Sequence, residues 1–298
     1  MDMIDLRYLV AAVEAGNFAK AANALGRDES SISRRIAHLE EELGLTLFER
    51  GHFGIRLTKG GGGVMIHVRR ALAGFDAVMT AGRRYGEGEA GEIRLGVRMP
   101  PVGEPLRSIL AIWRKENPGV VLALYELNDA ALFTSLAERL LDIVLTTQHA
   151  LPAHAVSSPL YRERLVVALP ESHSLASRES VDWNVLRHET LLVQGWDESQ
   201  SEREFYASRL GSGTEFRVHA VSKQAILALV GAGFGITFAA ASQAEVIFPG
   251  VIYRPISEAD AWIEVCLAWN PQSEEAAVGR FLAFMRDAVQ SRRLLADA

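Results

Sequence analysis

Apolar residues near the start of the chain recur at helical spacing in three successive segments. The stripes consist of Leu6, Leu9, Val10 and Val13, then of Phe18, Ala21, Ala22 and Leu25, and then of Ile32, Ile36, Leu39 and Leu43. Gly16 and Gly26 follow the first two stripes, where a left-handed residue commonly ends a helix. Asn17 and Asp28 stand next, at N-cap positions. The pattern predicts three short helices, with a tight turn joining the last two.

Polar side chains occupy the other side of the third predicted helix. Ser30, Arg34 and Ala37 lie roughly opposite its apolar stripe, and Ser33 and Arg35 flank it. Small hydroxyl groups and arginines suit the major groove of DNA, where arginine binds guanine or phosphate. Amphipathic helix pairs with a glycine turn also occur in all-α proteins that do not bind DNA, so the flanking sequence matters.

That flanking sequence predicts a short hairpin after the helices. Within ERGHFGIRLT, Gly51 and Gly54 favour a hairpin tip between two extended segments. The basic residues around the tip are Arg50, His52 and Arg56. Three helices and a basic hairpin form a winged helix-turn-helix, in which the hairpin, or wing, contacts the phosphate backbone.

Residues 1 to about 60 resemble the N-terminal domain of the LysR-type transcriptional regulators. The matching segments, in the family's order, are LRYLVAAVEAGNFAKAANAL, SISRRIAHLEEELGLTLFER and RLT. The resemblance implies binding to double-stranded DNA. The predicted DNA-binding residues are Asn17, Glu29, Ser30, Ser31, Ser33, Arg34, Arg35, Arg50, His52 and Arg56.

The start of the recognition helix departs from the family pattern. The family usually has Ser-Gln-Pro-Ala where this chain has Asp28, Glu29, Ser30 and Ser31. A carboxylate accepts a hydrogen bond from cytosine N4, so one hypothesis is that Glu29 alters the base preference. The alternative is that an acid in the first helical turn interacts favourably with the helix dipole and contacts no base.

A further apolar stripe follows the predicted wing at coiled-coil spacing. It consists of Val64, Val68, Leu72, Phe75 and Met79. Such a helix either packs on its own chain or pairs with a second copy, and we expect pairing. The resemblance implies the same, because the linker helix is the dimer contact in the LysR-type family. Two recognition helices related by a two-fold axis predict a partly palindromic operator. The sequence does not distinguish a homodimer from a homotetramer.

From residue 92 onward, predicted strands alternate with predicted helices. The strands EIRLGV, VVLALYEL and DIVLTT are separated by two amphipathic helices, which indicates a parallel sheet with right-handed crossovers. LVVALP, TLLVQG and FRVHAVS begin a second such unit, which continues with a helix from Lys223 and the strand GITFA. Chain crossings near residues 161–165 and 264–269 would join the two units and leave a cleft between them.

This arrangement resembles the periplasmic-binding-protein-like effector domain of the same family, in fragments such as RLLDIVL and ALVGAGFGITF. The predicted fold is multidomain: an N-terminal all-α winged helix-turn-helix (1–58), a linker dimerisation helix and hinge (59–90), and a C-terminal α/β two-lobed effector domain (91–298). Lobe I is expected at about 91–162 and 268–298, and lobe II at about 163–267.

Ligands of open parallel sheets bind beyond the carboxyl ends of the strands, close to helix N-termini. The residues at those places are Arg98, Met99, Pro100, Pro101, Thr146, Thr147, Gln148, Gln194, Gly195, Trp196, Ser222 and Lys223. Arg98 or Lys223 is expected to hold a carboxylate, and Trp196 to cover an apolar or aromatic body. The predicted effector is therefore a small organic molecule with a carboxylate or aromatic group.

Net charge neither supports nor opposes DNA binding. The 298 residues carry a formal charge of −6, and residues 1–59 contain 8 Lys and Arg against 9 Asp and Glu, which gives −1. The position of the arginines, rather than their excess, would then determine binding. No secretion signal is present at the N-terminus, which predicts a cytoplasmic location. The apolar run at 225–241 is broken by three glycines and is interpreted as a helix, a turn and a strand, not a membrane span.

No catalytic or cofactor motif stands out. Cys266 is predicted to be a buried, inert thiol. The sequence GAGFG follows a helix instead of preceding one, unlike a dinucleotide fingerprint, and the eight histidines lack metal-ligand spacing. We therefore expect a transcription factor that is not an enzyme and uses no cofactor or metal, and that contacts DNA, an effector and in some cases RNA polymerase. The alternative is a solute-binding or ligand-processing protein without sequence-specific DNA binding.

Overall fold

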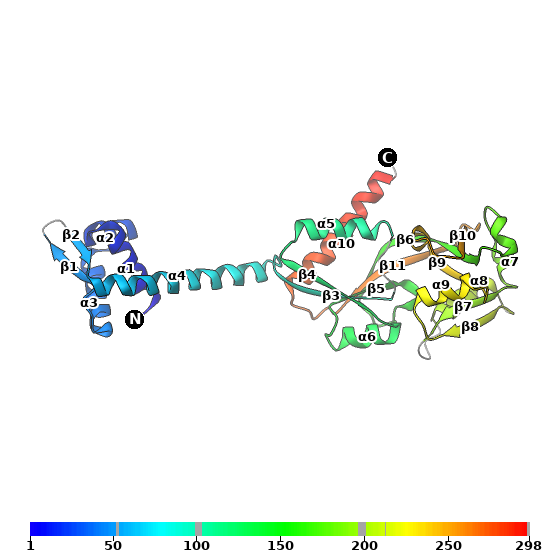
Figure 1. Cartoon of the computed structure of the whole chain (residues 1–298), viewed down its shortest axis with the longest axis horizontal. Coiled ribbons are helices and arrows are strands. Elements are labelled where there is room, and N and C mark those ends of the chain that lie inside the picture. Colours follow the sequence, from blue (N-terminus) through cyan, green and yellow to red (C-terminus); the bar gives the residue numbers. More distant parts are fainter. Residues whose placement is uncertain (52–53, 99–102, 196–200, 212, 297–298) are drawn as a thin grey trace. The chain divides into compact units, whose positions relative to one another are not determined.

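The chain forms two compact units, Met1–Arg84 and Tyr85–Ala298. The computed structural model describes residues 1–51, 54–98, 103–195, 201–211 and 213–296, without the side chains of residue 50 and residues 292–296. Figure 1 shows the helices and strands of each unit, which we treat separately.

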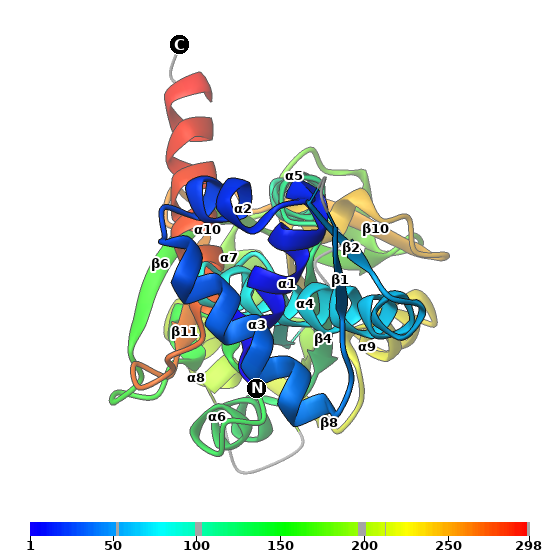
Figure 2. The same ribbon diagram turned by 90° about the vertical axis from the view of Figure 1, so that its left-hand side faces the viewer.

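The first unit contains the predicted three helices and hairpin, followed by a long helix (Figure 2). Its elements are α1 (Met3–Ala15), α2 (Phe18–Leu25), α3 (Glu29–Leu43), β1 (Phe48–Gly51), β2 (Gly54–Leu57) and α4 (Lys59–Gly86). Asn17 and Asp28 cap α2 and α3 through their side chains, as the sequence predicts. Gly16, Gly26 and Gly44 end α1, α2 and α3 in the left-handed conformation. The local sequence thus defines the helix-turn-helix.

The core of this unit is built from the predicted stripes, with two exceptions. Ile32, Ile36 and Leu39 of α3 are buried among the apolar residues of α1, α2 and α4. Leu25 and Leu43, which belong to the same stripes in the sequence, are each 38 % exposed. Both are the last residues of their helices, where the chain turns away from the core.

The wing is held against the first helix pair by the backbone. β1 and β2 are antiparallel, and the N–H of Ile55 donates to the carbonyl of Gly16 at 2.9 Å. Gly54 has a φ of +122°, and a Cβ there would collide with the Gly16 carbonyl oxygen. Only glycine fits this approach, so the wing has a fixed position on the helical core.

The second unit is an α/β domain with two hydrophobic cores. Its strands are β3 (Gly91–Val97), β4 (Val120–Glu126), β5 (Ile143–Thr147), β6 (Ser157–Pro170), β7 (Thr190–Gln194), β8 (Glu215–His219), β9 (Thr237–Ala240), β10 (Val251–Pro255) and β11 (Trp262–Trp269). Its α-helices are α5 (Leu106–Glu116), α6 (Asp129–Ala137), α7 (Trp183–Leu186), α8 (Ser201–Leu210), α9 (Lys223–Gly231) and α10 (Ala276–Ala296). Short 3₁₀ turns are η1 (Gln148–Ala150), η2 (Ser174–Ser177) and η3 (Ala241–Glu245).

Lobe I contains the predicted parallel strands. β3 pairs in parallel with β4 and β5, and β11 runs antiparallel between β5 and the first half of β6. Helices α5 and α10 cover one face of this sheet and α6 covers the other (Figure 1). Trp113 of α5 packs edge-on against Phe281 of α10, with ring centroids 4.9 Å apart.

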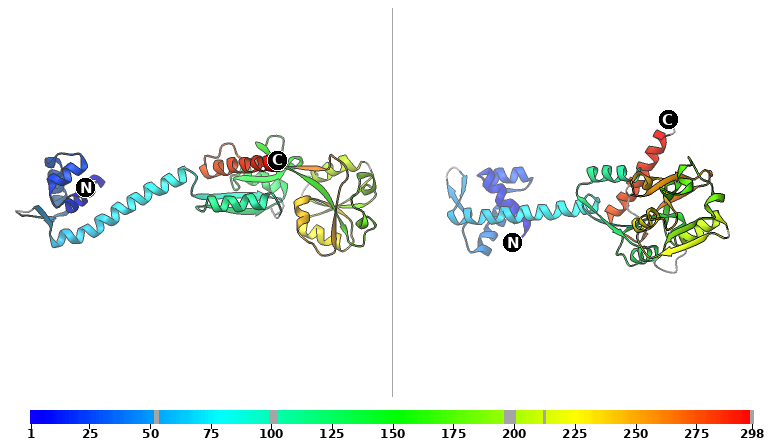
Figure 3. Two further views of the ribbon diagram at one scale, coloured as in Figure 1. Left: turned by 90° about the horizontal axis from the view of Figure 1, so that it is seen from above. Right: turned by 45° about the vertical axis from the view of Figure 1, so that its right-hand side comes forward.

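Lobe II is built around the second half of β6, which pairs with β9 and β10. β7 and β8 form a parallel pair, as expected of the second unit. The rest of that unit differs from the prediction, because β6 runs antiparallel to both β9 and β10. The long strands β6 and β11 contribute to the cores of both lobes and pass from one lobe to the other (Figure 3). The predicted chain crossings therefore exist. Helix α8, which the sequence analysis did not predict, packs in the core of lobe II through Tyr206 and Leu210.

Candidate DNA-binding and effector-binding sites

Helix α3 presents the side chains that the sequence assigns to DNA. Glu29, Ser30 and Arg34 are exposed, and Arg34 reaches back to the carbonyl of Ser30 at 3.2 Å. The hydroxyl of Ser30 donates to Asp28, which also accepts the N–H of Ser31 at 2.8 Å. These two hydrogen bonds hold the pKa of Asp28 below its usual value, and the bond from Ser30 has the larger effect. The start of α3 therefore carries two acidic residues, one ionised as a cap and one exposed.

Arg35 also forms contacts that the sequence does not predict. Its guanidinium donates to Asp5 at 2.7 Å and to Asp2 at 3.0 Å, and Asp5 is buried at the start of α1. These hydrogen bonds raise the pKa of Arg35 above its ordinary value, and the bond to Asp5 has the largest effect. Arg35 therefore has a structural role where α3 meets α1, and its contact with DNA stays a prediction.

The other predicted DNA contacts fall into three groups. Asn17 uses its side-chain oxygen to cap α2, accepting from Ala19 and Lys20. Ser31 and Ser33 are half-buried on α3. Arg56 is exposed on the wing, with its guanidinium 3.2 Å from Glu49. His52 and the side chain of Arg50 lie outside the described part of the chain.

The stripe on α4 is divided between two environments. Val68 is buried in the core of the first unit, and Val64 and Leu72 pack against the same core. Phe75 and Met79 are exposed, and so are Val78 and Tyr85 on the same stretch of helix. The first half of the predicted dimerisation stripe therefore stabilises the chain's own N-terminal domain, and its second half is an exposed apolar surface.

A pocket opens between the two lobes of the second unit. It contains about 860 Å³ of space free of protein atoms, part of it open to solvent. Lobe I contributes residues of β5, α5 and β11, and lobe II contributes residues of α8, α9 and β9. Of the predicted effector-binding residues, the pocket is lined by Arg98, Thr146, Thr147 and Lys223. The strand ends chosen from the sequence therefore contribute four described residues to this pocket.

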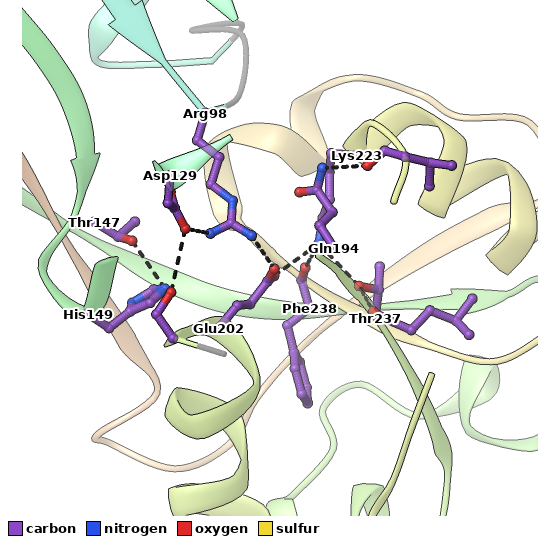
Figure 4. Close-up of polar contacts among 12 residues, drawn as sticks. Arg98, Asp129, Thr147, His149, Gln194, Glu202, Lys223, Thr237 and Phe238 are labelled. Carbon is purple, nitrogen blue, oxygen red and sulfur yellow. Dashed lines mark hydrogen bonds and ion pairs between the residues drawn. The ribbon is translucent and has the colours of Figure 1, made fainter. Parts of the chain in front are cut away.

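A chain of charged groups crosses this pocket from one lobe to the other (Figure 4). Arg98 pairs with Asp129 of α6 and donates to Glu202 of α8 at 2.7 Å. Glu202 lies 3.9 Å from the Lys223 ammonium. We call Asp129, Arg98, Glu202 and Lys223 the ionic chain. All four side chains are at least 87 % buried, so each charge depends on its neighbours for stabilisation.

Lys223 is fixed by further hydrogen bonds inside lobe II. Its ammonium donates to the carbonyl of Phe238 at 2.6 Å and to the hydroxyl of Thr237 at 3.1 Å. Burial lowers the pKa of Lys223, with Glu202 opposing that shift. Arg98 and Lys223 thus both have internal partners, so a ligand carboxylate would compete with Asp129 and Glu202 for them, and their role in effector binding stays a prediction.

Four other predicted effector residues that the structure describes are not among those lining the pocket. Gln194 donates to the carbonyl of Val221 at 3.1 Å, and Ser222 caps α9. Gln148 accepts from the Cys266 thiol at 3.3 Å. A Cβ at Gly195 would lie 2.5 Å from Val218, so this glycine is needed for packing. Each of these four residues therefore has a structural role, and contact with the effector stays a prediction for them. The predicted residues outside the described ranges are Met99, Pro100, Pro101 and Trp196.

The structure adds residues that the sequence analysis did not select. These are Asp129, His149, Tyr161, Glu163, Glu202, Tyr206 and Phe238, of which all but Asp129 line the pocket. Tyr161 and Glu163 stand two positions apart on β6, so the pleat directs them to the same side. The alternation of side chains along β6, which crosses between the lobes, could have predicted that Tyr161 and Glu163 face the pocket. Asp129 and Glu202 lie on helices and gave no such signal.

His149 is neutral in the folded protein at physiological pH. Its ring stacks on Phe205 of α8 with centroids 4.2 Å apart, and its Nε2 lies 3.1 Å from the Thr147 hydroxyl. Burial lowers the pKa of His149 to about 4, while Glu202 opposes the shift and Arg98 adds to it. His149 therefore joins η1 to α8 as an uncharged group.

The effector domain is expected to lose stability as the pH falls below 6.5, the ordinary pKa of histidine. Below that value the unfolded chain binds a proton at His149 and the folded chain does not. The loss from this group is about 2 kcal/mol between pH 7 and pH 5. His149→Asn removes it: the variant is less stable at pH 7 because the stacking is lost, but its stability changes less with pH. Urea unfolding at both pH values measures this, and an equal pH dependence in the two proteins would contradict it.

Cys266 is buried, as predicted, and burial raises its pKa to about 11. The part of the chain that the structure describes contains no cluster of His, Cys, Asp and Glu able to hold a metal ion. Among the same residues, no helix is long and apolar enough to cross a membrane.

A winged helix-turn-helix joined to a two-lobed domain with a pocket defines a DNA-binding regulator that carries its own ligand-binding domain. The family "Bacterial regulatory helix-turn-helix protein, lysR family" matches residues 3–62, and "LysR substrate binding domain" matches residues 86–290. The chain belongs to the LysR family of transcriptional regulators. The expected family and function are thereby confirmed over the alternative of a protein without specific DNA binding.

Known regulators are similar over almost the whole chain. The regulator XapR of Escherichia coli (strain K12) is 31 % identical over 263 residues, which cover 86 % of this chain and 88 % of XapR. AlsR of Bacillus subtilis (strain 168) is 28 % identical over 100 % of this chain and 99 % of its own. The crystal structure of CbnR, a LysR family regulator, has a TM-score of 0.82 at 23 % identity and covers 96 % of this chain and 100 % of CbnR. That similarity supports the fold.

Proposed function

We propose that this chain binds a partly palindromic operator as a homodimer or homotetramer and responds to a small organic effector in the inter-lobe pocket. The observation that carries the proposal is that both lobes line one pocket and meet there through the ionic chain. A ligand in that pocket contacts both lobes, so it binds more tightly to one lobe arrangement than to another. Such differential affinity is what shifts a conformational equilibrium.

The DNA contacts that we propose combine the recognition helix and the wing. On α3, the exposed Ser30 and Arg34 face away from the core, and Glu29 stands beside them in the first turn. On the wing, Arg56 is exposed next to the tip. Arg34 on the helix would contact a base, and Arg56 on the wing would contact a phosphate. Lobe rearrangement would then change the spacing or bend of the bound operator, and contact with RNA polymerase would follow.

The dimer contact that we propose is the exposed half of the α4 stripe. Phe75, Val78 and Met79 expose large apolar side chains on successive turns, with Met79 56 % exposed. Exposed apolar residues at heptad-like spacing favour pairing with a second helix of the same kind. We also propose that the protein acts in the cytoplasm and binds its effector without converting it, since a His149 with a pKa of about 4 is a poor base at pH 7.

Met79→Asp is expected to dissociate the dimer. Pairing would bury the new carboxylate without a partner, which raises the dissociation constant about 100-fold or more. Sedimentation velocity measures the association, and footprinting on the region upstream of the gene measures the joint protection of two half-sites. Ala77→Asp is the matched control, because it places the same charge on the opposite side of α4. A Met79→Asp protein that remains dimeric and protects both half-sites would refute this dimer contact.

A further inference from the structure

The charges of the inter-lobe pocket are unequally compensated. In the ionic chain, Arg98 and Lys223 are matched by Asp129 and Glu202. Glu163, on β6, lines the same pocket but is not part of the ionic chain. Among the described lining residues and their ion-pair partners, three carboxylates therefore face two cations, and the unmatched carboxylate is Glu163.

Glu163 has hydrogen-bond donors but no counter-ion. Its carboxylate accepts the N–H of Ser242 at 3.1 Å. Within the described ranges Glu163 forms no ion pair with a Lys, Arg or His, and the adjacent Arg162 pairs instead with Glu264 at 3.0 Å. Burial raises the pKa of Glu163, and hydrogen bonds from Ser242 and Tyr161 oppose that rise. The carboxylate of Glu245 adds to the rise in the pKa of Glu163. A half-buried carboxylate without a cation is stabilised by any cation that enters the pocket.

The rest of the pocket also disfavours an anionic ligand. Arg98 and Lys223 are already paired with Asp129 and Glu202, so a ligand carboxylate that approached either cation would meet the negative charge of Glu202 and a cation that is already compensated. The remaining lining is largely apolar and aromatic, including Leu165, Phe238 and Ile263. An organic body fits there without a negative group.

One uncharged group in the pocket also lacks a partner. Thr146 of β5 is 5 % exposed and lines the pocket, and its hydroxyl has no hydrogen-bond partner within the described structure. A buried hydroxyl without a partner is costly unless a ligand or water satisfies it. Thr146 therefore marks a second polar contact for a ligand.

We infer that the effector is a small organic amine whose protonated nitrogen pairs with Glu163 while its apolar body lies against the aromatic lining and a polar atom meets Thr146. The inference rests on the proposed ligand-sensing function and specifies the class of ligand. It replaces the carboxylate effector that the strand-end residues suggested.

The test compares three probes with one aromatic body and different charge: benzylamine, benzyl alcohol and benzoate. Saturation-transfer NMR titrations of the full chain at pH 7 measure each dissociation constant. For a probe of about eight heavy atoms we expect benzylamine to bind at about 1 mM, at least about tenfold more tightly than benzyl alcohol, with no saturable binding of benzoate. Glu163→Gln is expected to remove the amine preference and to leave benzyl alcohol binding unchanged. Glu245→Gln, which neutralises the exposed neighbour, serves as the control and should retain the preference.

Three results would overturn the inference: equal or tighter binding of benzyl alcohol or benzoate, an amine preference that survives Glu163→Gln, or no saturable benzylamine binding up to about 20 mM. Retained benzyl alcohol binding shows that the Glu163→Gln pocket is folded. Footprinting of the wild-type chain tests the proposed function separately. Saturable benzoate binding with normal footprints would reject the amine while leaving a ligand-responsive regulator in place.

Discussion

Arg98→Met is expected to lower the free energy of unfolding of the effector domain by about 3–5 kcal/mol. The reason is that the guanidinium, itself 13 % exposed, pairs with Asp129 in lobe I and with Glu202 in lobe II. Methionine fills a similar volume but leaves both carboxylates buried without their cation. Because Glu202 is the contact between α8 and the end of β3, the variant also weakens the connection between the lobes.

Calorimetry of the full chain measures this loss, in which the effector-domain transition should fall by about 10 °C. Arg107→Met is the matched control: Arg107 forms an exposed pair with Glu104, and exposed pairs contribute less than about 1 kcal/mol. The quadruple variant Arg98→Met, Asp129→Asn, Glu202→Gln, Lys223→Met removes all four charges of the ionic chain and should regain most of the stability. If the quadruple variant is as unstable as Arg98→Met, the loss reflects packing and the electrostatic explanation is wrong.

The fold was predictable where local chemistry determines it. Gly16, Gly26 and the cap residues Asn17 and Asp28 define the helix ends within a few residues of sequence. Strand and helix alternation then yielded the parallel sheet of lobe I, because parallel strands require crossover connections. α8 was missed because its exposed polar residues mask a short buried face.

The pocket was predictable as a place but not as a chemical environment. Strand ends selected Arg98 and Lys223, since topology alone brings these positions together. Their partners depend on long-range contacts: Arg98 and Glu202 are 104 positions apart, and Glu202 lies on a helix where an acid normally faces water. A sequence pattern shows a charge but not whether another charge is already next to it. The carboxylate effector was inferred from unpaired cations that the folded chain does not have.

The same reasoning separates two adjacent arginines on the recognition helix. Arg34→Ala is expected to weaken operator binding about tenfold or more per half-site without changing thermal stability, because one good base contact is worth that much. Arg34 is exposed, and its internal contact is to the carbonyl of Ser30 in its own helix. Arg35→Ala is expected to lower the melting temperature of the N-terminal domain, because it removes the cation from the buried Asp5.

Fluorescence anisotropy with an operator fragment, at fixed salt, measures binding, and thermal unfolding measures stability. Arg35→Lys is the conservative control: it keeps a positive charge near Asp2 and Asp5 and should retain much of the stability, although one ammonium cannot reproduce the geometry of the guanidinium. The salt dependence adds a second criterion, because loss of a base contact at Arg34 leaves the slope unchanged, whereas loss of a phosphate contact reduces it by about one. An Arg34→Ala protein that binds the operator normally, paired with an Arg35→Ala protein that is fully stable but does not bind, would reverse the roles assigned to the two arginines.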